Sequence, residues 1–292
     1  TFRGEVSHSV EAFGPVSTLM PYKGIEAAIE LSKKGKGSLC STIVTADNGL
    51  AKQYVIAAAP HHGRILILNR ECAKESTGHG SPLPMLVHGG PGRAGGGEEM
   101  CGARGVQHYM QRVAIQGSPT SITAVTSVYQ PHAKQATDEK HPFKKYFEEL
   151  QIGDTVITHR RTIKESDIAQ FANLSWDHFY VHTDATALEG TIFEKPAAHG
   201  YFILGAAAGL FVDAAKGPVL LNYGIENCRF VKPVYAGTTI GVRLTCKEKT
   251  SQDLKDGDEV PKGIVKWYVE VYSDSGESVI IATILTMVTK QF

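Results

Sequence analysis

The apolar run that begins at Gly200 constrains the fold of this chain more than any other feature. Residues 200–215 have the length of a helix and carry very few charges, and a helix that is apolar on most sides has to be buried. Strand patterns follow it at Val219–Ile225, Cys228–Phe230, Thr239–Lys247, Gly263–Ser273 and Val279–Thr289. We therefore predict an α+β fold for residues 149–292, in which an antiparallel sheet wraps around one central helix.

The segment 1–132 has a different pattern, in which strands and helices alternate. The predicted strands are Val16–Pro21, Ser38–Thr45 and Arg64–Asn69, and the predicted helices are Gly24–Lys33 and Gly49–Ala59. This alternation predicts a parallel α/β sheet. A short helix is expected at Gln107–Arg112 and a β-branched strand at Ile122–Tyr129.

Residues 78–105 hold many glycines and prolines and predict a long loop. Its glycine run at 89–97 lacks the lysine of a phosphate-binding P-loop, so we expect a structured loop there, and Cys101 is expected to be an ordinary thiol. A polar stretch with prolines predicts an inter-domain linker, placed at residues 133–148. The chain opens directly on its first pattern, so residues 1–132 are expected to be the rear part of a larger domain.

The composition argues against several classes of protein. The 30 basic and 30 acidic residues balance, which does not fit a nucleic-acid-binding protein. No apolar run approaches the roughly 20 residues of a membrane span, so we expect no membrane partner. The 5 cysteines are scattered and form no C-x-x-C pair, which argues against a disulfide framework and a metal site and favours the cytoplasm.

The candidate catalytic residues are Asp177, His182 and Gly200. A carboxylate and an imidazole that share one water, beside a helix start whose N–H groups face an oxyanion, are the parts needed to add water to a conjugated thioester. Two plainer interpretations stay open. Asp177 and His182 are also consistent with surface groups or a helix cap, and Gly200 with relief of crowding against the sheet.

These residues also carry a resemblance to a known family. Asp177, a His five residues later, the His199-Gly200 pair and the segment 226–240 resemble the MaoC-like, or (R)-specific enoyl-CoA hydratase, family. The resemblance implies a hot-dog fold, an acyl-CoA substrate whose CoA is part of the substrate, no separate cofactor for hydration, and a homo-oligomer. One departure is Phe179-Tyr180, where the family usually has Asn-Pro.

The first segment carries a second resemblance. The motif EAFGPV, residues 11–16, resembles the aldehyde dehydrogenase family, in which its Glu holds the nicotinamide ribose and its Phe flanks the nicotinamide ring. It implies that Glu11 and Phe13 bind NADP. The family's catalytic Cys and general-base Glu precede this motif and are not in the sequence, so this fragment alone is not expected to oxidise aldehydes.

The order of the two segments resembles the PaaZ-type fusions of phenylacetate degradation. That resemblance implies an oxepin-CoA hydrolase fused to an NADP-dependent 3-oxo-5,6-dehydrosuberyl-CoA semialdehyde dehydrogenase, with the departure at Phe179-Tyr180 shaping the pocket for a cyclic substrate. Two alternatives remain. One is an (R)-specific enoyl-CoA hydratase acting on linear chains, and the other is a non-catalytic assembly module that oligomerises through the predicted strand Ile122–Tyr129.

Overall fold

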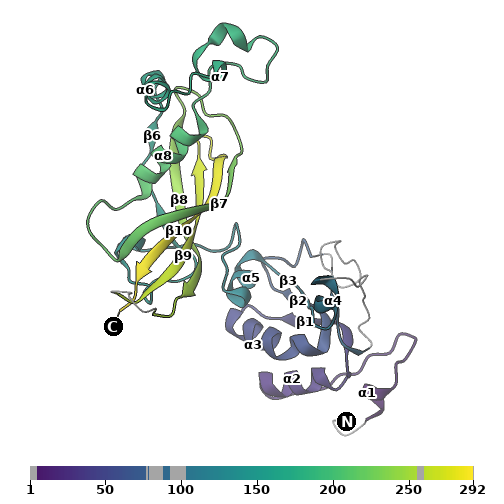
Figure 1. The fold of residues 1–292 in the computed structure, drawn as a ribbon. Helices are drawn as coiled ribbons and strands as arrows, with labels where there is room; N and C mark the ends of the chain where they lie inside the picture. The colour runs from purple at the N-terminus through teal and green to yellow at the C-terminus, as the bar shows by residue number, and fades with distance from the viewer. Residues whose placement is uncertain (1–4, 77, 79–87, 93–102, 255–259, 292) are drawn as a thin grey trace. The chain divides into compact units, whose positions relative to one another are not determined.

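Two units make up the fold, Thr1–Ala133 and Lys134–Phe292 (Figure 1). The computed structural model describes residues 5–76, 78, 88–92, 103–254 and 260–291. Most of the predicted loop at 78–105, with Cys101 and the second half of its glycine run, lies outside the described residues. Within the described part of the chain, no helix has both the length and the apolar character that crossing a membrane requires.

The first unit contains the predicted parallel sheet. Its strands are β1 (Ser38–Val44), β2 (His62–Leu68) and β3 (Ala114–Gln116), which pair in the order β1-β2-β3. The helices are α1 (Val6–Ser9), α2 (Ile25–Lys33), α3 (Asn48–Ala58), η1 (Ala59–His61), α4 (Ala103–His108) and α5 (Pro119–Thr126). Ile29 of α2 and Val55 of α3 form one buried cluster with Ile65 and Ile67 of the central strand, so the helices and the sheet share a hydrophobic core.

Three predictions for the first unit are wrong in whole or in part. The short helix expected at Gln107–Arg112 lies earlier, as α4, and ends at His108. Residues 16–21 form no strand, and Ile122–Tyr129, read as a strand from its β-branched residues, lies largely in α5. The helix forms because Ser118 caps it, with its Oγ accepting the N–H of Ser121 at 3.3 Å, and Pro119 occupies its first turn. The assembly alternative therefore loses the strand on which it relied.

The second unit is a sheet wrapped around one helix. Its strands are β4 (Ala136–Thr137), β5 (Asp154–Ile157), β6 (Arg161–Thr162), β7 (Val219–Phe230), β8 (Thr239–Ser251), β9 (Lys262–Tyr272) and β10 (Ser278–Thr289). The sheet order is β4-β5-β8-β9-β10-β7, antiparallel except for β4 and β5, and β6 pairs with β8. The helices are η3 (Pro142–Lys144), α6 (Glu165–Ser175), α7 (Tyr180–Thr183), η4 (Ala185–Leu188) and α8 (Gly200–Phe211).

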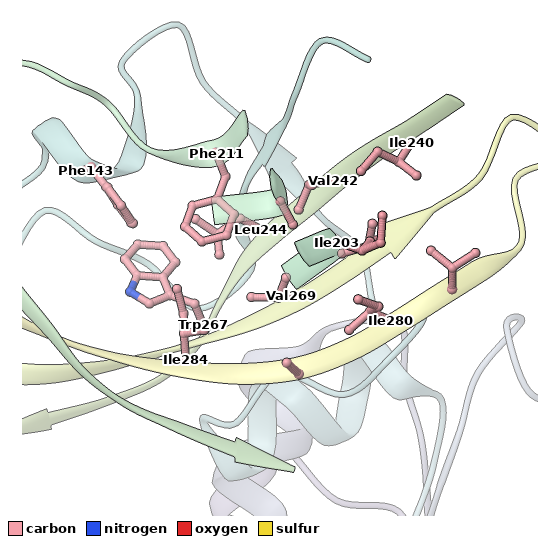
Figure 2. Close-up of a cluster of buried hydrophobic side chains, with 14 of the residues drawn as sticks. Phe143, Ile203, Phe211, Ile240, Val242, Leu244, Trp267, Val269, Ile280 and Ile284 are labelled. Carbon is pink, nitrogen blue, oxygen red and sulfur yellow. The ribbon is translucent and has the colours of Figure 1, made fainter. Parts of the chain in front are cut away.

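The core of the second unit lies between α8 and the sheet, and Figure 2 shows its side chains gathered there. Ile203, Ala207 and Phe211 recur every four residues along α8 and are buried, because this spacing places them on one helix face. Trp267 of β9 is fully buried, and its Nε1–H donates to Thr286 Oγ1 at 2.8 Å. The predicted α+β layout is therefore present, although the helix ends at Phe211 rather than near residue 215.

The stretch 133–148, predicted to be a linker, forms part of the second unit from Lys134 onward. Phe143 and Phe147 are buried in the core, where each large apolar side chain contributes about 1.5–3 kcal/mol. Lys145 Nζ lies 2.9 Å from Asp154 Oδ2 and 3.0 Å from Asp138 Oδ2, which ties the stretch to β5. The sequence predicted a linker because most residues of this stretch are polar, and the two buried aromatic residues stand isolated among them.

Candidate functional site

Asp177 follows directly after the end of α6. Trp176 ends this helix in the left-handed conformation, with φ at 64°, and so turns the chain away from the helix axis. The Asp177 N–H donates to Ser175 Oγ at 3.3 Å, and Asp177 Oδ1 accepts the N–H of Phe179 at 3.2 Å. These local bonds hold an exposed carboxylate in place and leave its other oxygen available to a ligand.

His182 lies on the short helix α7 and is half-buried. Its Nδ1 is 2.6 Å from the carbonyl oxygen of Ala197. Because a carbonyl oxygen only accepts hydrogen bonds, Nδ1 carries the proton, and Nε2 of the neutral ring keeps its lone pair. His182 Nε2 can therefore accept a hydrogen bond from a water while Ala197 fixes the orientation of the ring.

His199 comes immediately before α8 and is only 1 % exposed. Its Nε2 is 2.9 Å from the carbonyl oxygen of Asp177, and its ring stacks on that of His182 with a centroid distance of 3.8 Å. Burial, the largest cause, lowers the pKa of His199, and the neighbouring His182 lowers it further. The ring therefore stays neutral at neutral pH.

Gly200 is the first residue of α8, beside the ring of Phe230. A Cβ atom at this position would lie 2.6 Å from Phe230 Cε1, so no larger residue fits without a shift. This contact supports the plainer interpretation, relief of crowding. It does not exclude the catalytic interpretation, in which the helix start binds an oxyanion. The N–H groups in the first turn of a helix have no partner within the helix and lie at the positive end of its dipole.

These four residues line one cavity of about 440 Å³. Its other walls are mainly apolar side chains, among them Ile203 from α8, Phe230 from β7 and Ile280 from β10. Asp177, His182 and Gly200, which the sequence singles out separately, are thus brought together at one place. A mostly apolar cavity with a few convergent polar groups is the usual form of a small-molecule site.

The same residues offer ligand atoms for a metal ion. One such atom from each of Asp177, His182 and His199 lies within 4.8 Å of the other two. The two imidazole rings, however, are inclined by only 29° and stack face to face. Two nearly parallel rings cannot both direct an in-plane lone pair at one ion, so the arrangement suits a hydrogen-bonded water better than a metal.

Glu11 and Phe13, the residues that the second resemblance assigns to NADP, lie in an irregular segment of the first unit after α1. Phe13 is 96 % exposed. Their assignment to the nucleotide stays a prediction.

The sequence did not identify two residues of the site. His199 entered only as the partner of Gly200 in a motif, and Phe230 only as part of a strand. A His directly before an apolar helix was the available signal for the first, but the contact of Phe230 with Gly200 depends on the sheet and has no local signal.

His182 also lines a second cavity of about 470 Å³, with His178 and Lys195.

The second unit is similar to proteins of a known family. A family model described as a MaoC like domain matches residues 148–266. Protein MaoC of Klebsiella aerogenes is 56 % identical over 252 residues, which cover 86 % of this chain and 75 % of that protein. This chain belongs to the MaoC-like family. The prediction of a MaoC-like domain is confirmed, and the helix wrapped by a sheet is its hot-dog fold.

The similarity to Protein MaoC is longer than the Lys134–Phe292 unit and so extends into the first unit. The (R)-specific enoyl-CoA hydratase of Rhodospirillum rubrum is 31 % identical over 100 residues, covering 34 % of this chain and 68 % of that protein. The 3,4-dehydroadipyl-CoA semialdehyde dehydrogenase of Aromatoleum evansii is 36 % identical over 84 residues, covering 29 % of this chain but only 16 % of that enzyme.

Proposed function

We propose that the MaoC-like unit adds water to the C=C bond of an α,β-unsaturated acyl-CoA thioester. The observation that carries this proposal is the meeting of Asp177 and His182 with the N-terminus of α8 at one apolar cavity. A carboxylate oxygen and an imidazole nitrogen within 4.8 Å of each other are close enough for one water to contact both. The relative named an (R)-specific enoyl-CoA hydratase supports the same chemistry.

In the proposed reaction, Asp177 takes a proton from the water while the water oxygen bonds to the β-carbon of the thioester. His182 Nε2 orients the water, since its Nδ1–H is fixed on Ala197. The N–H of Gly200 polarises the thioester carbonyl and stabilises the enolate that forms, and the α-carbon then receives the proton. Proton transfer by a positioned side chain typically contributes about 10²- to 10⁴-fold in rate.

The finer proposal is that the substrate is oxepin-CoA. Water adds to the ring carbon conjugated with the thioester, and the carbon then bears both a hydroxyl and the ring oxygen. Collapse of this adduct breaks the bond to the ring oxygen and turns the attacked carbon into a ketone, and the enol released at the other end of the opened chain tautomerises to an aldehyde. Support comes from Phe179-Tyr180 at the position of the usual Asn-Pro, and from the relative whose name describes a CoA semialdehyde dehydrogenase.

For the first unit, we propose an origin in an NADP-dependent aldehyde dehydrogenase that would oxidise this aldehyde. The support is the motif at 11–16, with Glu11 and Phe13 as nucleotide-binding residues, and the partial similarity to the semialdehyde dehydrogenase.

We also propose that the protein forms a homo-oligomer. β7 is an edge strand of the sheet, and its side chains Leu221, Tyr223 and Ile225 are exposed. An apolar edge of this length is a ready surface for pairing with another chain.

The test compares oxepin-CoA with a linear trans-2-enoyl-CoA, following the loss of enoyl-thioester absorbance with purified chain. Faster loss with the cyclic substrate, and an aldehyde in the product, is the expected result. Equal or faster loss with the linear substrate would instead favour an ordinary (R)-specific hydratase. A folded oligomer that acts on neither substrate would contradict the catalytic proposal and favour the non-catalytic assembly module.

A further inference from the structure

His199 contacts both groups that are proposed to hold the water. Its Nε2 is 2.9 Å from the backbone oxygen of Asp177, and its ring lies against His182 with a centroid distance of 3.8 Å. The ring of Phe171 packs against it from α6, with a centroid distance of 5.0 Å. One buried side chain thus joins the turn after α6, the helix α7 and the start of α8.

The hydrogen bonds fix the proton of His199 on one nitrogen. The acceptor at Nε2 is a carbonyl oxygen, so Nε2 carries the proton and Nδ1 has the lone pair. The charged and titratable groups around the ring are Asp177, His182 and His178. A second proton on His199 would place a positive charge against the ring of His182, whereas a neutral His199 leaves the lone pair at His182 Nε2 undisturbed for orienting the water.

This ring is a costly choice if it only fills space. Nδ1 of His199 is buried and has no hydrogen-bond partner among the residues that the structure describes. A buried polar atom without a partner destabilises the fold, and an apolar ring of similar shape would not carry that cost. The donor at Nε2 is therefore the part of this side chain that an apolar replacement lacks.

We propose that His199 is a positioning residue, which uses its Nε2–H to hold the backbone of Asp177 and its ring face to hold His182. The inference deepens the proposed hydration and rests on it. His199 sets the separation of the carboxylate and the imidazole without bonding to the reacting atoms. Misplacement of a catalytic group by about 1 Å can cost on the order of 100-fold in rate.

The kinetic test uses two replacements of His199 and a neighbouring control. His199→Phe keeps a ring against His182 but removes the donor, and we expect kcat to fall about 10- to 100-fold with KM nearly unchanged. His199→Gln restores an N–H donor and should recover part of kcat. His178→Gln, at an exposed His in the same turn, should leave both constants unchanged. Full kcat in His199→Phe, or a change confined to KM, would overturn the inference.

A second measurement does not depend on activity. Nitrogen NMR of the imidazoles in the full chain should show His199 neutral with its proton on Nε2, and His182 with its proton on Nδ1. His199→Gln should preserve the His182 signals, whereas His199→Phe should shift them. Wild-type His199 with its proton on Nδ1 would overturn the positioning role even in an active enzyme. Correct tautomers in a chain that hydrates no enoyl-CoA would instead count against the proposed function.

Discussion

The two ends of α8 each border a cavity, and the cavities differ in chemistry rather than in size. Both have mainly apolar walls, but the one at the N-terminus, about 440 Å³, adds His182 and His199 to its carboxylate Asp177, whereas the one at the C-terminus, about 410 Å³, has the carboxylate Asp213 beside residues such as Phe143. At the C-terminal end, Lys144 Nζ lies 3.1 Å from Asp213 and bonds the carbonyl oxygens of residues 215 and 216.

The difference shows what the fold supplies and what the turns add. A helix favours negative charge at its N-terminus and positive charge at its C-terminus. Lys144 lies just beyond the C-terminal end, paired with Asp213, while the turns at 176–199 surround the N-terminal end with proton-transfer groups. The fold forms a cavity at each end of α8, and side chains outside this helix make the N-terminal one a candidate active site.

The largest expected effect is the loss of hydration in Asp177→Asn. Asn keeps the size of the side chain but cannot take a proton from water, so we expect kcat to fall about 10²- to 10⁴-fold. The matched control is Asp213→Asn at the other end of α8, which removes only the ion pair with Lys144 and should leave hydration unchanged. Both rates are measured from enoyl-thioester absorbance, and an active Asp177→Asn with a native fold would contradict the role of this carboxylate.

A smaller effect is expected for two glycines of the same helix. Gly200→Ala places a Cβ against the ring of Phe230 and should destabilise the unit by about 1–3 kcal/mol, while pushing that ring into the cavity and lowering activity. Gly209→Ala meets open space and should be neutral or stabilising by up to about 1 kcal/mol, because Ala favours helix.

Denaturation followed by tryptophan fluorescence measures this pair of variants. Both tryptophans, Trp176 and Trp267, lie in the second unit, so the signal reports on that unit. Equal stabilities for the two glycine variants would show that Phe230 does not constrain the start of α8.

The smallest effect concerns stability against pH. Burial lowers the pKa of His199, and it also lowers that of His141 near the other end of α8. A lowered folded pKa means that the unfolded chain binds more protons, so this contribution is complete above about pH 6.5 and is lost as pH falls from there towards the folded pKa.

His199→Gln and His141→Asn should each reduce the loss of stability on acidification, and every unit by which a pKa is lowered corresponds to about 1.4 kcal/mol. Urea denaturation at a series of pH values checks this. If neither variant changes the pH dependence, the buried neutral state of these rings is contradicted.

The sequence predicted the elements whose pattern is local. The apolar period of α8, the strand pattern of β9 and the alternation through α3 and β2 each appear close to the predicted place. Asp177, His182 and Gly200 could be named because their residue types and spacing suit one chemistry. Their meeting at one cavity depends on the left-handed turn at Trp176, which no pattern in the sequence predicts.

The failures share a physical cause. In α5, a cap and a proline outweigh the strand preference of β-branched residues, and in 133–148 two buried aromatic residues outweigh a polar composition. The two partners of His199 are distant in the sequence: Asp177 lies 22 residues away and His182 lies 17 residues away, and only folding brings them into contact with it. Contacts of this kind are set by tertiary packing.

The most direct test is a crystal structure of the full chain with a saturated acyl-CoA, which has no double bond to hydrate. The account predicts the thioester carbonyl within hydrogen-bond distance of the Gly200 N–H, with Asp177 and His182 facing the β-carbon across one water. A thioester in the cavity at Phe143 and Leu221, or one that does not approach Gly200, would contradict the assignment of the active site to the N-terminal end of α8.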